Sequence, residues 1–420
     1  MHKLLILTSL MPYPPQDGAS LRNWHMCKQL SQKMDVTVLG RTITPLSPDV
    51  IQSASSRSLH FEMSHIDRPS LPKKAIGAFR LLFSSYPIQI GGYEFARQHN
   101  ALTTLLAQTK FDFIQIDPWL YSYWPQVKET GAITVVSYHN IESELLIRQA
   151  KIETSIGRRL LKRLDAKRME RIEASLFHEA DISIVTTKRE QVLLKERFPN
   201  ARILVAPNGV DFETIQVLPP RKTKRILFVG TLDYDPNIDA VTHFVRNIFP
   251  ILRSRYRDIT FHVAGLNPGP RIMLLNNEPN VQIHGFVPNL RHVYQEASVC
   301  VAPLRAGSGS RLKILEAMAY GRPVVSTQLG CEGLQVETGT HLLIADKPEE
   351  FANAIGNILD DPNMGRKLAA NARKFVEIEH SWKSIVEMVL VEFESVMASL
   401  NQFQNNMNQH ESVCYTSRVG

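Results

Sequence analysis

The segment whose residue types are best suited to chemistry is 303–327, which reads PLRAGSGSRLKILEAMAYGRPVVST. It predicts the end of a strand, a glycine-bearing loop, a helix that begins near Arg311, and a further strand. Gly307 and Gly309 let the backbone approach a ligand closely. The free N–H groups at the start of the helix favour a phosphate, and Arg311 and Lys313 add two cations beside it. The segment therefore predicts a phosphate site.

Glu316 follows Arg311 by five residues, about one and a half turns into the same helix. Its carboxylate can accept two hydrogen bonds from a vicinal diol such as a ribose. The alternative is a surface loop with solvated charges and a glutamate on an exposed helix face. That alternative is favoured for any one residue alone, whereas the glycines, cations and carboxylate taken together favour a nucleotide site.

The elements that must position this segment are short apolar strands that alternate with helices. In the first part of the chain we expect strands at 4–10, 36–40, 113–117, 133–139, 181–187 and 203–209. After a proline-containing basic linker at 211–224, the pattern resumes at 225–230, 259–265, 281–287, 299–304, 322–327 and 341–346. Such strands indicate parallel sheets covered by helices on both faces. The predicted fold class is α/β, with two doubly wound Rossmann-like domains, 1–210 and 225–380, that face each other across a cleft.

Several segments together resemble the GT-B-fold glycosyltransferases, in the large retaining family 4 ("group 1") class, and the resemblance runs over nearly the whole chain. The strongest motif is LEAMAYGRPVVST, which is close to the core of the family's nucleotide-sugar signature. The others are VAPNGVD (205–211), LFVGTLDYDPNIDAV (227–241), HGFVPNLRHVYQEASVCVAPL (284–304) and HSW (380–382). Each motif is weak alone, and together they are specific.

The resemblance implies that a sugar is transferred, with retention, from a nucleoside-diphosphate sugar to a saccharide or lipid-linked acceptor in glycan or polysaccharide biosynthesis. It implies that the nucleotide binds the second domain, that the acceptor binds mainly the first, and that a helix at 381–400 crosses back to the first domain. Residues 401–420 are rich in Asn, Gln and Ser, and we expect them to form a disordered tail. The residues expected to bind the donor are Gly18, Gly230, Phe286, Val287, Gly307, Ser308, Gly309, Ser310, Leu312 and Glu316.

The chain departs from the family pattern in two places. The family typically has two glutamates eight positions apart; if Glu316 is the second, Ser308 stands where the first should be. The family's usual Arg and Lys after the first strand of the second domain are also missing from TLDYDPN at 231–237. Arg311 and Lys313 resemble relocated replacements, and we expect them to be catalytic by stabilising the charge on the leaving diphosphate. No acidic metal-binding cluster stands beside the phosphate loop, so we expect neither a metal nor another cofactor to be required.

His139 stands at the carboxyl end of a predicted strand, where this family has a histidine near the anomeric carbon. We expect it to stabilise the transition state or to bind the sugar, with a purely structural histidine as the alternative. Asn140 and Glu142 flank it, and Asp117 ends the neighbouring predicted strand, so all three are candidates on the acceptor side.

In the first glycine loop, Gly18 resembles part of the family's Gly-Gly pair, with Ala19 in place of the second glycine. Arg22 on the following helix is expected to meet a phosphate or an acceptor anion. An ordinary strand–helix turn is the alternative.

The formal net charge of +7 favours anionic partners without choosing among them. A basic helix predicted over 157–177 carries apolar residues at helical spacing. It either lies on anionic lipid or packs into the core with a solvated basic face. No aromatic platform interleaves the basic stretches, so we expect no nucleic-acid partner.

Four cysteines lie far apart and form no C-x-x-C pair, which is typical of a reducing compartment and gives no support to a structural zinc site. No apolar run approaches the roughly 18–20 residues of a membrane-spanning helix. We therefore expect a cytoplasmic protein, with peripheral contact to the inner face of the membrane if the basic helix binds lipid. A non-catalytic nucleotide- or glycan-binding protein on the same fold stays open as an alternative.

Overall fold

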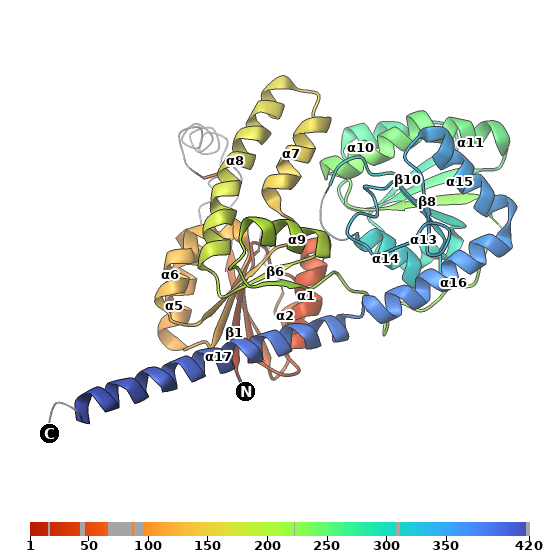
Figure 1. Ribbon diagram of the computed structural model, residues 1–420. Helices are drawn as coiled ribbons and strands as arrows, with labels where there is room; N and C mark the ends of the chain where they lie inside the picture. Colours follow the sequence, from red (N-terminus) through yellow and green to blue (C-terminus); the bar gives the residue numbers. More distant parts are fainter. Residues whose placement is uncertain are drawn as a thin grey trace.

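The computed structural model contains two parallel β-sheets covered by helices (Figure 1). It describes residues 1–15, 17–42, 47–65, 86–87, 96–221, 223–307 and 311–416. The first sheet consists of β1 (Lys3–Leu7), β2 (Asp35–Thr42), β3 (Leu59–His65), β4 (Phe113–Ile116), β5 (Ile133–Ser137), β6 (Ile182–Val185) and β7 (Ile203–Val205). The second consists of β8 (Arg225–Val229), β9 (Thr260–Ala264), β10 (Val281–Gly285), β11 (Val299–Ala302), β12 (Val324–Ser326) and β13 (Leu343–Ile344).

Helices connect the strands in both domains. Those of the first are α1 (Gly18–Leu30), α2 (Pro48–Ala54), α5 (Ala96–Gln108), α6 (Trp124–Glu129), α7 (Glu142–Ile152), α8 (Ile156–Glu179) and α9 (Lys188–Arg197). Those of the second are α10 (Asp235–His243), α11 (Phe249–Arg255), α12 (Pro270–Met273), α13 (Leu290–Glu296), α14 (Leu312–Ala319), α15 (Pro348–Asp360) and α16 (Pro362–Glu379). The last helix is α17 (Trp382–Thr416).

The strand order shows that both sheets are doubly wound. The first runs β3-β2-β1-β4-β5-β6-β7 and the second runs β10-β9-β8-β11-β12-β13. The chain therefore reverses its direction of travel between β1 and β4, and again between β8 and β11, and such switch points open a crevice at the carboxyl ends of the strands. The predicted α/β fold class with two doubly wound domains is confirmed.

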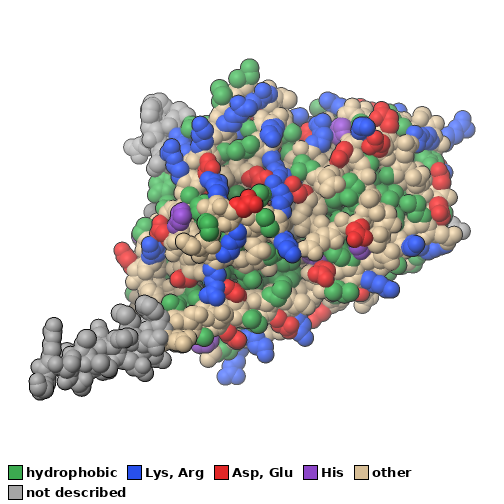
Figure 2. Space-filling model, in the orientation of Figure 1, with side chains coloured by type: hydrophobic (Ala, Val, Ile, Leu, Met, Phe, Trp, Pro, Cys, Tyr) green, Lys and Arg blue, Asp and Glu red, His purple; other side chains and the backbone are tan. Residues whose placement is uncertain are grey.

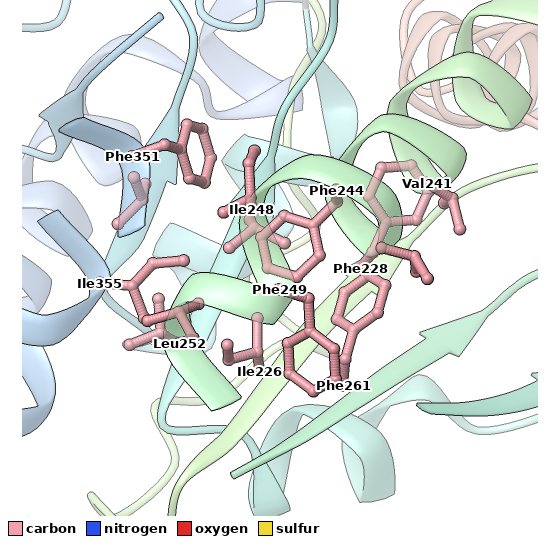
Figure 3. Close-up of a cluster of buried hydrophobic side chains, with 14 of the residues drawn as sticks. Ile226, Phe228, Val241, Phe244, Ile248, Phe249, Leu252, Phe261, Phe351 and Ile355 are labelled. Atoms are coloured by element: carbon pink, nitrogen blue, oxygen red, sulfur yellow. The ribbon is translucent and has the colours of Figure 1, made fainter. Parts of the chain in front are cut away.

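Strand β8 illustrates why these apolar segments form central strands. Its successive side chains point to opposite faces of the sheet. Ile226 and Phe228 enter the core beneath α10, α11 and α15, whereas Leu227 enters the core beneath α13 and α14. Figure 3 shows the first of these cores, in which the ring centroids of Phe244 and Phe261 lie 4.4 Å apart. Burial on both faces keeps the carboxyl end of β8 in a fixed position.

Helix α17 packs against the first sheet although it follows the second domain in the sequence (Figure 1). Phe393 is buried and stacks on Phe113 of β4, with ring centroids 4.7 Å apart. Trp382 is also buried, and a Cβ on Gly209 would lie 2.6 Å from its ring, so this contact requires glycine. The two stretches of chain that cross between the domains are therefore held together.

A direct hydrogen bond joins these two crossings. The backbone N–H of Val210 donates to the carbonyl oxygen of His380 at 2.7 Å, and His380 Nδ1 lies 2.8 Å from the carbonyl oxygen of Asn208. The two crossings are therefore paired side by side at the junction between the domains.

The predicted end of the last helix was wrong. The sequence predicts that it ends at Leu400 and that a disordered tail follows, whereas α17 continues to Thr416. Residues 401–416 contain neither Gly nor Pro, and polar Asn and Gln residues lower helix propensity without terminating a helix that is already formed. Within the described part of the chain, none of the helices is both long enough and apolar enough to cross a bilayer.

The packing of α17 gives a stability prediction. Phe393→Ala should destabilise the first domain by about 3–5 kcal/mol, because it opens a cavity against Phe113. Thermal unfolding followed by circular dichroism measures the loss, with Val391→Ala as the control because Val391 is 66% exposed on the same helix. A melting temperature equal to that of the control would contradict this packing.

Candidate active site

The two domains meet at the edges where their strands end. A Cβ on Gly18, at the start of α1, would lie 3.1 Å from Leu312 Cδ1 at the start of α14. A Cβ on Gly333 would lie 2.4 Å from Thr187 Cγ2 just after β6. Gly18 and Leu312, both predicted to bind the donor, are thus brought together across the domain boundary.

Arg311 occupies the N-cap position of α14 and is buried, with 8% of its surface exposed. Its Nη2 donates to the carbonyl oxygen of Leu329 at 3.1 Å. Gly307 adopts a φ of +124°, and a Cβ there would lie 2.9 Å from Arg311 Nη1. The loop therefore needs glycine at this position both for its backbone conformation and for its contact with the guanidinium. Ser308, Gly309 and Ser310 lie outside the described residues.

Lys313, on the first turn of α14, is partly buried and has neutral contacts. Its Nζ donates to Asn237 Oδ1 at 2.5 Å and lies 4.3 Å from the centroid of the Phe228 ring. It forms no ion pair within the part of the chain that the structure describes. Burial and, to a smaller extent, the charge of Arg311 lower the pKa of Lys313 to about 7, while Glu316 opposes the shift.

Gly230 at the end of β8 makes room for this arrangement. A Cβ there would lie 2.9 Å from Asn237 Nδ2 and 3.1 Å from Lys313 Nζ. Asn237 also donates from Nδ2 to the carbonyl oxygen of Thr231 at 2.8 Å, which orients its oxygen toward the lysine. Sequence reasoning missed Asn237, although the loop that contains it stood out for lacking the family's cations.

Glu316 lies one turn further along α14 and accepts a hydrogen bond from the Tyr294 hydroxyl at 3.4 Å. Burial raises the pKa of Glu316 to about 7, while the Tyr294 hydroxyl and Lys313 act in the opposite direction. Tyr294 belongs to α13, the helix that follows Phe286 and Val287. Phe286 is 63% exposed and Val287 is partly buried, so the predicted contact of these two residues with the donor stays a prediction.

On the first domain, His139 and Asp117 follow the neighbouring strands β5 and β4. His139 Nε2 lies 3.7 Å from Asp117 Oδ1, and Asp117 Oδ2 accepts a hydrogen bond from the Ser9 N–H at 3.3 Å. The adjacent ends of parallel strands thus bring an imidazole and a buried carboxylate together. The carboxylate can orient the ring.

Arg22 has a different role from the one the sequence predicts. Its guanidinium donates to the carbonyl oxygens of Ala206 at 2.8 Å and Pro207 at 3.0 Å, and to Asn208 Oδ1 at 3.0 Å. The side chain is 1% exposed, and burial lowers its pKa to about 10. These bonds tie α1 to the end of β7, beside the first crossing between the domains, so the predicted anion-binding role gives way to a structural one.

Glu142 and Glu173 form a pair of buried carboxyl groups behind His139. The backbone N–H of Glu142 donates to Glu173 Oε1 at 2.7 Å, and Ser143 Oγ donates to Glu173 Oε2 at 2.5 Å. Asn140 Nδ2 donates to Glu142 Oε1 at 3.4 Å. Burial, reinforced by the charge of Glu173, raises the pKa of Glu142 to about 8, and burial raises that of Glu173 to about 7. Glu142 is therefore mostly protonated at neutral pH.

Sequence reasoning missed Glu173, although its spacing carried a signal. Glu173 lies four residues after Met169 and next to Ile172, on the apolar face of α8. A glutamate on a buried helix face must be hydrogen-bonded or protonated. Among the residues that the structure describes, no three His, Cys, Asp or Glu side chains are grouped to hold a metal ion.

Two Rossmann-like domains that meet at the start of α14, where Arg311 and Lys313 lie, define a protein of the GT-B class. The model for Glycosyltransferase Family 4 matches residues 17–214, and the model for Glycosyl transferases group 1 matches residues 223–361. The chain belongs to this glycosyltransferase family, as its sequence motifs predicted.

Individual proteins agree with this assignment. The D-inositol 3-phosphate glycosyltransferase of Corynebacterium urealyticum is 26% identical over 255 residues, which are 53% of this chain and 59% of that protein. The curated relatives are matched over only 45–62% of their own length. The sucrose-phosphate synthase of Thermosynechococcus elongatus shares the fold, with a TM-score of 0.72, 19% identity, and coverage of 95% of this chain and 100% of that one. Anabaena HepE, solved with UDP and glucose, has a TM-score of 0.66, 14% identity, and coverage of 94% and 100%.

The buried carboxyl pair gives a pH prediction. Between pH 4.5 and about 8 the folded protein retains a proton on Glu142 that the unfolded chain loses, so stability should fall as the pH rises through this window, by at most about 1.4 kcal/mol per pH unit from this group. Glu142→Gln removes this contribution and should gain stability relative to the wild type as the pH rises. Melting temperatures from pH 5 to 8.5 measure the effect, with the exposed Glu170→Gln on α8 as the control. Parallel curves for wild type and Glu142→Gln would contradict the assignment.

Proposed function

We propose that this protein is a retaining glycosyltransferase that moves a hexosyl group from a nucleoside-diphosphate sugar to a saccharide or lipid-linked acceptor in glycan biosynthesis, without a metal. The observation that supports this most directly is Lys313, a partly buried cation next to Arg311 whose Nζ contacts the Asn237 amide oxygen and the Phe228 ring. A diphosphate at the start of α14 would supply the missing negative charge. HepE, with its bound UDP and glucose, supports a uridine nucleotide as the first donor to test.

In the proposed reaction the bond between the anomeric carbon and the diphosphate oxygen breaks, and its electron pair stays on that oxygen. Arg311, Lys313 and the N–H groups at the start of α14 stabilise the charge as it develops. The acceptor hydroxyl oxygen forms the new bond to the anomeric carbon, on the face that the leaving group occupied, and its proton passes to the departing diphosphate oxygen. A bound diphosphate also favours the protonated form of Lys313, because opposite charges raise the pKa of a lysine.

The remaining second-domain residues would hold the nucleoside. Glu316 would accept hydrogen bonds from the ribose hydroxyls and fix the donor's orientation. Phe286 and Val287 would lie against the base. Gly18 would allow the first domain to approach the diphosphate, since its missing side chain already lets α1 contact Leu312.

His139 and Asp117 would act on the sugar from the opposite domain. In this proposal the imidazole donates or accepts a hydrogen bond at a sugar hydroxyl, and Asp117 orients it from 3.7 Å. Asn140 and Glu142 follow on the acceptor side, where the mostly protonated Glu142 can serve as a hydrogen-bond donor.

We further propose that the first turns of α8 contact anionic lipid at the cytoplasmic face of the membrane. The second half of α8 packs into the core through Met169, Ile172 and Leu176, as one of the two predicted alternatives requires. The first turns instead expose apolar side chains, Ile156 at 74%, Leu160 at 59% and Leu164 at 41%. Figure 2 shows Lys and Arg side chains gathered over this helix, and a lipid-linked acceptor makes such contact useful.

A donor panel tests the proposal. Thermal shift and calorimetry with UDP-, GDP- and ADP-sugars find the nucleotide, and product analysis with saccharide and lipid-linked acceptors finds the transfer, with and without EDTA. The proposal predicts that one donor binds and is consumed, with the anomeric configuration kept. Binding without turnover across all acceptors would favour a non-catalytic nucleotide-binding protein, and failure to bind any nucleoside diphosphate would contradict both.

Two variants of second-domain residues should differ in their kinetics if Arg311 stabilises the charge on the leaving group. Arg311→Ala should lower kcat by about 10²–10³-fold, because it removes a donor that acts on the developing charge, with a smaller change in KM. Glu316→Ala should mainly weaken donor binding. Steady-state kinetics and calorimetry distinguish the two, with circular dichroism confirming the fold. An unchanged kcat for Arg311→Ala would remove it from the leaving-group role.

A third variant tests the proposed action of His139 on the sugar from the domain opposite the nucleotide. His139→Ala should leave affinity for the nucleoside diphosphate nearly unchanged, because the nucleotide binds the second domain, while transfer slows. The exposed His178→Ala serves as the matched control on the same domain. A large loss of nucleotide affinity in His139→Ala would contradict the proposal, because it would show that the histidine acts on the nucleotide rather than on the sugar.

A further inference from the structure

Arg148, on α7 of the first domain, reaches across the domain boundary. Its Nη1 donates to the carbonyl oxygen of Gly307 at 2.8 Å and to Glu332 Oε2 at 2.5 Å, and its Nη2 lies 3.2 Å from Glu332 Oε1. On its own domain, Nη2 donates to Glu144 Oε1 at 2.6 Å. The side chain is 14% exposed. One guanidinium therefore joins α7 to two separate segments of the second domain.

Both second-domain partners of Arg148 belong to segments that contact Arg311. Gly307 is the glycine whose left-handed backbone leaves room for the Arg311 guanidinium. Glu332 belongs to the turn that contains Leu329, and the Leu329 carbonyl oxygen accepts from Arg311 Nη2 at 3.1 Å and from the Glu332 N–H at 3.3 Å. Arg148 thus holds both sides of the pocket in which Arg311 sits.

A second arginine shows how the cluster is balanced. Arg189 on α9 donates to Glu144 Oε1 at 2.7 Å, and its Nε lies 3.4 Å from Glu332 Oε1. Within the first domain the group of Glu144, Arg148 and Arg189 carries one excess positive charge, and Glu332 of the second domain neutralises it. Among the described residues, Arg189 contacts Glu144 and Glu332 but not Gly307, so it shares the charge interaction without touching that glycine.

We propose that Arg148 is a positioning residue that transmits domain closure to Arg311. When the domains close, Arg148 binds Glu332 and the Gly307 carbonyl, which fixes the loop and turn that hold the Arg311 guanidinium. When they open, Gly307 and Glu332 lose these bonds, and the Arg311 guanidinium is no longer held in this position. The charge that stabilises the leaving group is then correctly placed only while the first domain, with its bound acceptor, is docked. This inference rests on the proposed function.

The expected kinetic signature is a loss in kcat without a matching loss in nucleotide affinity. Arg148→Ala should lower kcat by about 10²-fold, since small misplacements of charge-stabilising groups have effects of that order. Affinity for UDP or GDP, whichever the wild type binds, should stay within about threefold. Glu332→Gln should lower kcat in the same direction, and the double variant should be little worse than Arg148→Ala alone, because both remove one interaction.

Two controls separate loop positioning from attraction between the domains. Arg189→Ala weakens the same charge cluster but keeps the bond to Gly307, and it should change kcat by less than about threefold. Arg197→Ala removes an exposed pair with Glu170 inside the first domain and should change nothing. Equal losses in Arg148→Ala and Arg189→Ala would overturn the proposal, as would a wild-type kcat in Arg148→Ala.

A readout independent of catalysis keeps this test distinct from that of the proposed function. Amide hydrogen exchange over residues 299–307, measured with saturating UDP or GDP, should be faster in Arg148→Ala than in the wild type and unchanged in Arg189→Ala. If the wild type transfers no sugar but shows this pattern, the proposed reaction fails and the positioning contact stands. If exchange over 299–307 is the same in Arg148→Ala and the wild type, the positioning contact fails.

Discussion

The site depends on one constraint, the partial removal of the Lys313 ammonium from water. The direct contacts of this ammonium are an amide oxygen and an aromatic ring. Removing a charge from water without an opposite charge is costly, and the protein responds by lowering the pKa of Lys313 to about 7. Gly230 leaves room for this ammonium, and the Asn237 side-chain oxygen accepts a hydrogen bond from it. Arg311 adds a second cation, which is buried, at the start of the same helix. An anion bound at this point would relieve the cost, and for this reason we propose that a diphosphate binds here.

The two sheets make such a site possible because their buried strands hold the site residues of each domain in fixed positions. Strands buried on both faces fix the carboxyl ends of β8 and β11, from which the cationic loop and α14 follow. The domains are joined by two hydrogen-bonded crossings at 208–210 and 380–382, and in the described residues they also meet where Arg148 contacts Glu332 and where Gly18 approaches Leu312. Closure can therefore bring His139 toward the second domain without disturbing either core.

Much of this could be predicted from the sequence because the signals are local. Apolar strands that alternate with helices gave both sheets, and glycines followed by Arg311, Lys313 and Glu316 gave the start of α14. Contacts over long sequence separations could not be predicted. The structural role of Arg22 depends on the carbonyls at 206 and 207, and two partners of Arg148, Gly307 and Glu332, lie in the other domain. The end of α17 was missed because polar composition was taken for disorder, although no residue there terminates a helix.

The most direct test of the account is a crystal structure with a bound nucleoside diphosphate. The account predicts both phosphates at the start of α14, within hydrogen-bond distance of Arg311 and Lys313, with the ribose beside Glu316. Phosphates bound elsewhere, such as in the groove between α7 and α10 that Arg246, Arg271 and Arg305 line, would contradict it.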